Sequence, residues 1–153
     1  MKFSTGRKAA VLLAGLALLS LATDRVSTAA PAALPNPSLV FTGQESFQQG
    51  GKNFMRYNYA VENSADYPAE LFAPSPQLPP CGTNKKASRT WVDIYDQHGK
   101  RLYGFCALAK PADLNQLWFA LDSSVVPPSW VYIEMTDRAT NTKYKSNLAE
   151  TTN

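Results

Sequence analysis

The chain holds one histidine and two cysteines, which are side chains often used for proton transfer, nucleophilic attack or metal binding. His98 lies in the stretch Asp96-Gln97-His98-Gly99-Lys100, which is typical of a tight turn between two strands. A histidine at the tip of a turn is usually solvated. A serine–histidine–carboxylate arrangement stays open, yet the sequence contains neither a nucleophile elbow nor a glycine-rich oxyanion loop.

Sites for metal ions and phosphates are not indicated either. Asp93, Asp96 and Asp137 could contribute to a calcium site, but the acidic spacing of an EF-hand is missing. Asp96 is more simply the residue that begins the turn, and the sequence has no glycine-rich phosphate loop. We therefore predict a protein that is not an enzyme and has no metal and no cofactor, with a small hydrolase as an alternative.

Cys81 and Cys106 are the only cysteines, and they enclose a strand–turn–strand pattern. No Cys-x-x-Cys motif and no cluster of histidines or carboxylates accompanies either of them, which argues against a redox or metal-binding pair. In an exported chain, two cysteines usually form one disulfide. We predict a Cys81–Cys106 bridge that stabilises the fold by roughly 3–4 kcal/mol on the chain-entropy account.

The residues between the cysteines predict a β-hairpin. The first strand alternates, with Val92 and Ile94 on one face, and a three-residue loop ending at Gly99 closes the turn. Pairing Asp96 with Lys100 then sets the register, in which Ile94 faces Leu102, Val92 faces Gly104 and Trp91 faces Phe105. We assign the face of Val92, Ile94 and Leu102 to the core, because the opposite choice would bury Asp93.

In this register, aromatic side chains gather on the outward face of the hairpin and of one further strand. The candidate binding surface consists of Trp91, Tyr95, Tyr103, Phe105, Trp130 and Tyr132. Aromatic residues interleaved with charges, here Asp93 and Arg101, are typical of surfaces that recognise proteins or carbohydrates. Alternatively, another segment of the chain covers this face, where cross-strand aromatic pairs stabilise a sheet by roughly 0.2–1 kcal/mol each.

The first residues have the pattern of a secretory signal peptide. Lys2, Arg7 and Lys8 precede an apolar run over residues 9–22, and small-residue cleavage patterns follow. The run is short for a helix that spans a bilayer. We expect a signal peptide over 1–29, no membrane anchor after its removal, and a periplasmic or secreted protein.

The charge of the chain after the signal argues against a nucleic-acid partner. Four of the fifteen basic residues and one of the twelve acidic residues precede Ala30, which leaves eleven of each. Surfaces that bind nucleic acids are basic. We therefore expect no nucleic-acid partner, and the expected partner is an unknown protein or carbohydrate of the cell envelope.

The rest of the chain predicts short strands separated by turn residues. Residues 30–37 are expected to form a flexible leader, 38–148 a single domain, and 149–153 a disordered tail. Strands are predicted over 38–42, 54–62, 130–136 and 143–147, with a short strand or extended edge over 69–72. One short helix near 112–118 is expected to place Leu114, Leu117 and Trp118 inward.

This pattern predicts an all-β fold, an antiparallel β-sandwich of about 6–8 strands. The segment Tyr57-Asn58-Tyr59-Ala60-Val61-Glu62-Asn63 resembles the B strand of immunoglobulin-like and fibronectin type III-like domains of exported bacterial proteins. The terminal hairpin over 130–147 resembles their F and G strands. The resemblance implies an immunoglobulin-like sandwich.

Together these patterns predict an exported, non-catalytic binding or structural module of the cell envelope. One alternative is a secreted protease inhibitor that presents the proline-rich segment 74–80, with Leu78 exposed to its partner. The other alternative, a small hydrolase, requires His98 to converge with a carboxylate or a hydroxyl group.

Overall fold

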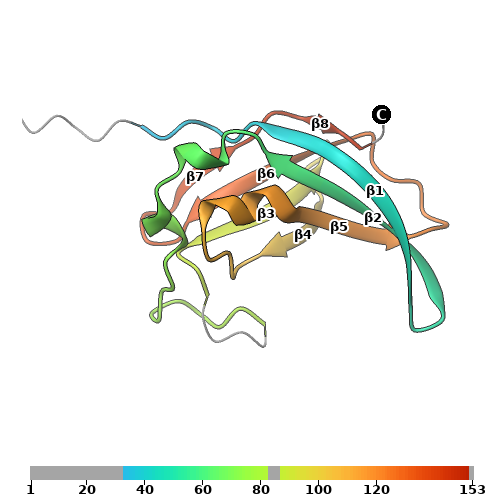
Figure 1. Ribbon diagram of the computed structural model, residues 1–153, viewed down its shortest axis with the longest axis horizontal. Coiled ribbons are helices and arrows are strands. Elements are labelled where there is room, and N and C mark those ends of the chain that lie inside the picture. Colours follow the sequence, from blue (N-terminus) through green and yellow to red (C-terminus); the bar gives the residue numbers. More distant parts are fainter. Residues whose placement is uncertain (1–32, 83–86, 152–153) are drawn as a thin grey trace, which may run out of the picture. The chain divides into compact units, whose positions relative to one another are not determined.

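The computed structural model describes residues 33–82 and 87–151 (Figure 1). The predicted signal peptide over 1–29 lies outside these residues. The described residues form eight strands: β1 (Leu39–Gln49), β2 (Lys52–Val61), β3 (Thr90–Asp96), β4 (Arg101–Phe105), β5 (Leu117–Asp122), β6 (Trp130–Asp137), β7 (Thr142–Lys145) and β8 (Ala149–Glu150). Three short 3-10 helices, η1 (Ser64–Asp66), η2 (Ala69–Phe72) and η3 (Pro111–Gln116), lie between them.

The strands form two antiparallel sheets, which confirms the predicted β-sandwich. One sheet has the order β1-β2-β5, and the other has the order β4-β3-β6-β7 with β8 paired to the start of β6. The strands β4 and β5 are edges of different sheets and contact each other. No described helix has the length and hydropathy needed to cross a membrane.

The core lies between the two sheets and follows the predicted alternation. In β2, Tyr57, Tyr59 and Val61 are buried, and in β6 the buried side chains are Val131, Ile133 and Met135. These residues form one hydrophobic cluster together with Val92 and Ile94 of β3 and Leu117 and Phe119 of β5. Because successive side chains of a strand point to opposite faces, the alternating apolar residues bury one face of each strand.

The β3–β4 hairpin confirms the predicted core residues of β3, but the predicted register of β4 is wrong. Ile94 pairs with Tyr103 rather than with Leu102, and Val92 pairs with Phe105. The cause is a bulge between the pair Ile94–Tyr103 and the pair Tyr95–Arg101, where β4 contains one extra residue. As a result, Tyr103 and Phe105 share the face of Val92 and Ile94 instead of the outward face of Trp91.

The turn of this hairpin follows the sequence closely. Gly99 has the left-handed φ of 84°, and the Asp96 carboxylate accepts hydrogen bonds from the backbone N–H groups of His98 and Lys100 at 2.9 and 2.8 Å. Asp96 therefore acts as the turn-starting residue. Its carboxylate is occupied by the backbone of the turn.

The disulfide between Cys81 and Cys106 is present, with 5.5 Å between the two Cα atoms. It ties the proline-rich segment to the end of β4. The same segment pairs with the chain before β3, since Ser75 N–H donates to the Ala87 carbonyl at 2.9 Å and Arg89 N–H donates to the Ala73 carbonyl at 3.0 Å.

A partly buried ion pair fixes the start of β3 to the end of β6. The Nε and Nη2 atoms of Arg89 donate to the two carboxylate oxygens of Asp137 at 2.7 and 2.6 Å. Asp137 is only 3% exposed and also accepts hydrogen bonds from Ala139 N–H and the Thr140 hydroxyl. The hydrogen bonds from Arg89 lower the pKa of the Asp137 carboxyl to about 2.

Two segments differ in type from their predictions. Residues 69–72 form the 3-10 helix η2 rather than a strand, and they bury Leu71 and Phe72. The helix expected near 112–118 is η3, which ends at Gln116, and β5 begins at Leu117. Leu114 and Leu117 are buried as predicted, but Trp118 lies on a strand and its neighbours Leu117 and Phe119 occupy the core side.

Both ends of the predicted domain are longer than expected. Leu34 packs against the core, and the carbonyl of Pro35 accepts a hydrogen bond from the Tyr67 hydroxyl at 2.8 Å. The described part of the predicted flexible leader is therefore held in place. Ala149 and Glu150 form β8, and Thr151 is buried, so the prediction of a disordered tail is wrong for these three residues.

Candidate functional site

The six predicted binding residues lie on two separate surfaces. Trp91 and Tyr95 of β3 and Trp130 and Tyr132 of β6 share the outer face of the five-stranded sheet, where Tyr95 stacks on Tyr132 with 5.3 Å between ring centres. The other two predicted residues, Tyr103 and Phe105, lie on the opposite face because of the bulge in β4. The predicted surface is therefore not one continuous patch.

Apart from Trp130, which is 40% exposed, the aromatic and charged side chains on the outer face of the five-stranded sheet mostly pair with one another. Arg101 donates to the Asp93 carboxylate at 2.6 Å, and Lys143 donates to Glu134 at 2.7 Å. In addition, the Arg138 guanidinium lies 4.6 Å from the Trp91 ring centre, and the Lys145 ammonium lies 4.0 Å from that of Tyr132. Cross-strand and cation–π pairs of this kind stabilise a sheet without a ligand.

Tyr103 and Phe105 instead meet Trp118 where the edges of the two sheets come together. Tyr103 stacks on Trp118 with 4.7 Å between ring centres, and Phe105 packs edge-on against both rings at 6.2 and 5.1 Å. Trp118 projects from the side of β5 opposite to the buried Phe119. Phe105 also packs against the core, whereas Tyr103 and Trp118 line a groove.

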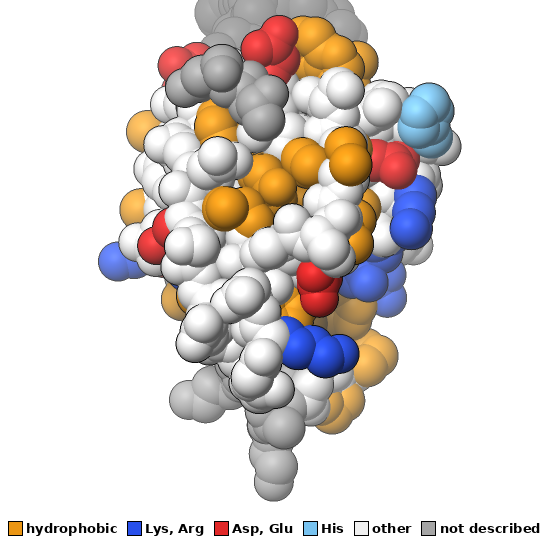
Figure 2. All heavy atoms as spheres, turned by 90° about the vertical axis from the view of Figure 1, so that its right-hand side faces the viewer, with side chains coloured by type: hydrophobic (Ala, Val, Ile, Leu, Met, Phe, Trp, Pro, Cys, Tyr) orange, Lys and Arg blue, Asp and Glu red, His pale blue; other side chains and the backbone are white. Residues whose placement is uncertain are grey.

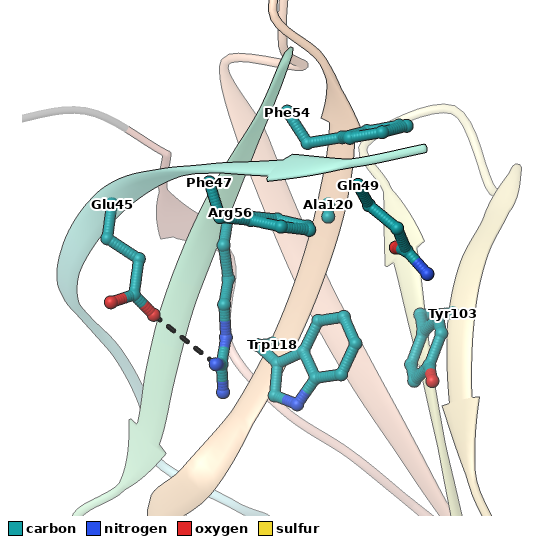
Figure 3. A pocket seen from close by; sticks show the side chains of 8 residues that line it. All are labelled: Glu45, Phe47, Gln49, Phe54, Arg56, Tyr103, Trp118 and Ala120. Atoms are coloured by element: carbon teal, nitrogen blue, oxygen red, sulfur yellow. Dashed lines mark ion pairs between the residues drawn. The ribbon is translucent and has the colours of Figure 1, made fainter. Parts of the chain in front are cut away.

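The groove has a volume of about 690 Å³ and lies over the outer face of the three-stranded sheet (Figure 3). We call it the aromatic groove, and its lining consists of Glu45, Phe47, Gln49, Phe54, Arg56, Tyr103, Trp118 and Ala120. All but Tyr103 come from β1, β2 and β5. Site volumes of about 300–1,000 Å³ are typical for small-molecule ligands.

Strand pairing explains why these side chains share one face. Glu45 pairs with Arg56, Phe47 pairs with Phe54, and Arg56 pairs with Ala120. Directly paired residues of antiparallel strands project to the same side of a sheet. The intervening residues of β2 and β5 form the other side, which is the core.

A β-bulge in β1 creates this arrangement. The pairing shifts between Phe41 and Gly43, so that Thr42 is the extra residue and Gly43 pairs with Asn58. Before the bulge Phe41 packs against the core, and after it Glu45 and the residues at alternate positions face the groove. Gly43 has a φ of 141°, which L-residues rarely adopt.

One side of the groove is a row of three stacked side chains. Trp118 lies between Arg56 and Tyr103 in Figure 3, with the Arg56 guanidinium carbon 4.6 Å from the indole ring centre. Arg56 also contacts the Glu45 carboxylate at 3.3 Å, and Phe47 stacks on Phe54 with 5.4 Å between ring centres. The exposed fractions of the Arg56 and Glu45 side chains are 37% and 56%, so solvent reaches both charges.

His98, the only histidine, lies apart from the aromatic groove. It borders a smaller hollow of about 220 Å³ between the β3–β4 turn and loop 123–129, on the end of the domain where Figure 2 shows hydrophobic side chains gathered. Val126 of this loop is 87% exposed. Among the described residues, no hydrogen bond of the His98 imidazole is found, and no group of three or more histidine, cysteine, aspartate and glutamate side chains could hold a metal ion.

The proline-rich segment forms a turn rather than an extended loop. Leu78 N–H donates to the Ser75 carbonyl at 3.1 Å, and Leu78 is half-buried. An inhibitory loop would hold this residue out to a protease. The described geometry therefore does not favour the inhibitor hypothesis.

Sequence reasoning missed most of the aromatic groove. Only Tyr103 belongs both to the predicted surface and to the groove lining. The signal that could have revealed the rest is the glycine at position 43 followed by alternating Glu45, Phe47 and Gln49, which indicates a strand that continues past an irregularity. No protein-family model matches the chain, and neither the curated proteins nor the solved structures contain a significant match.

Proposed function

We propose that the protein is an exported binding module that holds its ligand in the aromatic groove. One observation carries this proposal: aromatic side chains line the solvent side of a sheet whose other side already forms the core. In an antiparallel sheet with one buried face, the outer face is normally polar. Phe47, Phe54 and Trp118 depart from that rule, and they surround a concave space.

Export is supported by two features. The disulfide is typical of an oxidising compartment, such as the periplasm or the extracellular medium. The amino-terminal pattern of basic residues before a short apolar run favours secretion. A periplasmic or secreted location is part of the proposal.

We also propose that the sandwich is immunoglobulin-like, and the order of its strands supports this. If β1 to β7 correspond to strands A, B, C, C′, E, F and G, the sheets have the orders A-B-E and C′-C-F-G. In this correspondence β2 is the B strand, and β6 and β7 are the F and G strands. Domains with this architecture are frequently used for recognition rather than catalysis.

A single-tryptophan variant tests the proposed function. The double substitution Trp91→Phe and Trp130→Phe leaves Trp118 as the only indole, because the chain has three tryptophans. We expect a saturable change of Trp118 emission with a ligand selected from peptide-display and glycan libraries. Adding Phe54→Ala should shift the response to about tenfold higher ligand concentration or more, whereas Tyr132→Ala on the other sheet should leave it unchanged.

The proposal fails if no ligand from either library changes the emission of Trp118. It also fails if Tyr132→Ala weakens binding as much as Phe54→Ala does, since the outer face of the five-stranded sheet would then be the binding surface. Thermal unfolding of each variant shows that the fold is retained.

A further inference from the structure

We infer that the aromatic groove takes a neutral oligosaccharide, an inference that rests on the proposed binding function. The lining has an unusual composition. Four of its eight residues are aromatic, three carry a flat polar end group, and one is alanine. The described lining contains no leucine, isoleucine, valine or methionine.

This composition separates carbohydrate from peptide and lipid ligands. Grooves for amphipathic helices and acyl chains are lined by aliphatic side chains and methionine, which adapt to flexible apolar groups. A sugar ring presents a flat C–H face, which packs on an aromatic ring, and a rim of hydroxyl groups that both donate and accept hydrogen bonds. The aromatic groove offers both kinds of partner.

The polar side chains of the groove match pairs of hydroxyl groups. The Glu45 carboxylate accepts, the Arg56 guanidinium donates, and the Gln49 amide does both. Glu45 and Arg56 are more than one-third exposed and touch each other at a single contact of 3.3 Å. The Nε atom of Arg56 is buried and has no hydrogen-bond partner among the described residues, so the guanidinium can reach a ligand only through its Nη groups, and the Glu45 carboxylate through its free oxygen.

The charges in the groove favour a ligand without net charge. Glu45 and Arg56 offset each other, and the described lining has no other ionisable side chain that is charged at neutral pH. An acidic ligand would have to compete with Glu45 for Arg56, and a cationic ligand would meet Arg56 beside Glu45. A neutral sugar neither competes with Glu45 for Arg56 nor is repelled by either charge.

The groove presents aromatic side chains on two of its sides (Figure 3). Phe47, Phe54 and Gln49 lie on one side of the space and the row of Arg56, Trp118 and Tyr103 lies on the other (Figure 3). The volume of about 690 Å³ lies near the middle of the range for small-molecule sites. A ring can pack between the two aromatic sides while the chain continues along the groove.

The test uses an array of immobilised glycans that carries neutral, acidic and amino-sugar oligosaccharides, probed with the labelled mature protein. We expect binding to one class of neutral glycan. Titration of that glycan into the Trp91→Phe, Trp130→Phe variant should then change Trp118 emission with saturation. Phe54→Ala and Arg56→Ala should each weaken the affinity about tenfold or more, which corresponds to about 1.4 kcal/mol.

Two further variants sharpen the result. Glu45→Gln removes the acid and leaves Arg56 unopposed, so it should shift preference toward oligogalacturonate, an acidic oligosaccharide. Tyr132→Ala is the matched control and should change the affinity for the neutral glycan by less than about twofold.

Each outcome decides between defined possibilities. Binding only to acidic or amino-sugar glycans, or only to displayed peptides with a Trp118 response, overturns the neutral-sugar inference and leaves the binding function intact. No Trp118 response with any glycan or peptide overturns both. Glycan binding that survives Arg56→Ala and Phe54→Ala places the glycan elsewhere and also overturns the inference.

Discussion

The ion pair between Arg89 and Asp137 gives a prediction whose size can be worked out from the structure. Replacing Asp137 with asparagine keeps the size of the side chain and an oxygen acceptor for Ala139 N–H, but removes the negative charge that holds Arg89. We expect Asp137→Asn to destabilise the folded protein by about 2 kcal/mol near neutral pH.

The magnitude follows from the pKa of the carboxyl. Its folded value of about 2 lies below the ordinary value of 3.8, and each unit of difference corresponds to about 1.4 kcal/mol. The Asp137 side chain is only 4% exposed, so solvent screens this interaction little. Arg89 is one-third exposed and can turn to water in the variant, which keeps the loss below that of a completely buried pair.

The pH dependence separates this cause from a packing defect. Because the folded pKa is depressed, the contribution of Asp137 is fully present above about pH 4 and is lost as the pH falls toward about 2. The difference in unfolding free energy between wild type and Asp137→Asn should therefore shrink over this range. Urea unfolding followed by tryptophan emission at several pH values measures it.

The control is Asp93→Asn on the outer face of the same sheet. Asp93 pairs with Arg101, but the two side chains are 26% and 60% exposed. Exposed pairs contribute about 0–1 kcal/mol, so this variant should lose less than Asp137→Asn. The reasoning is refuted if Asp137→Asn costs the same free energy at acidic and neutral pH, or if Asp93→Asn costs as much.

The other predictions concern the disulfide, the bulge and the two sides of the three-stranded sheet. Cys81→Ser should lower the unfolding free energy by about 3.5 kcal/mol, the chain-entropy value for a separation of 25 residues, with an unchanged far-ultraviolet circular dichroism spectrum; equal stability of oxidised and reduced protein would contradict this. Gly43→Ala places an L-residue at a φ of 141° and should cost about 1–3 kcal/mol in urea unfolding, and a smaller loss would mean that β1 relaxes there. Phe119→Ala removes a core side chain and should cost about 3–5 kcal/mol. Phe54→Ala, on the neighbouring strand β2, should lower the unfolding free energy less than Phe119→Ala does, and equal losses would show that Phe54 belongs to the core.

The core could be predicted from the sequence where one strand keeps strict alternation. Residues 54–62 and 130–136 show a period of two, and the apolar positions predicted to face inward are buried, except Met55, which is partly buried. The disulfide and the turn at Gly99 were also predictable, because each depends on residues close in the sequence or on the only available partner. These features need no knowledge of a neighbouring sheet.

The aromatic groove could not be predicted in the same way, because it depends on two bulges. Each inserts one residue and reverses the faces beyond it. The bulge in β4 moves Tyr103 away from Trp91, and the bulge in β1 moves Glu45 and Phe47 to the outside. Trp118 was missed because the short helix η3 ends at Gln116, two residues earlier than its pattern indicates, so Trp118 falls on strand β5.

The bulge at Gly43 divides strand β1 into two parts with different environments: the part before it packs against the core, and the part after it lines the aromatic groove. Changes before Gly43, such as at Leu39 or Phe41, act on the shared interior and should alter how much protein is folded. Substitutions after Gly43, such as at Glu45 or Phe47, should alter the ligand preference of the aromatic groove while leaving the melting temperature nearly constant. Under the proposed binding function, the part of this hairpin beyond Gly43 can therefore change in specificity while the core of the domain stays the same.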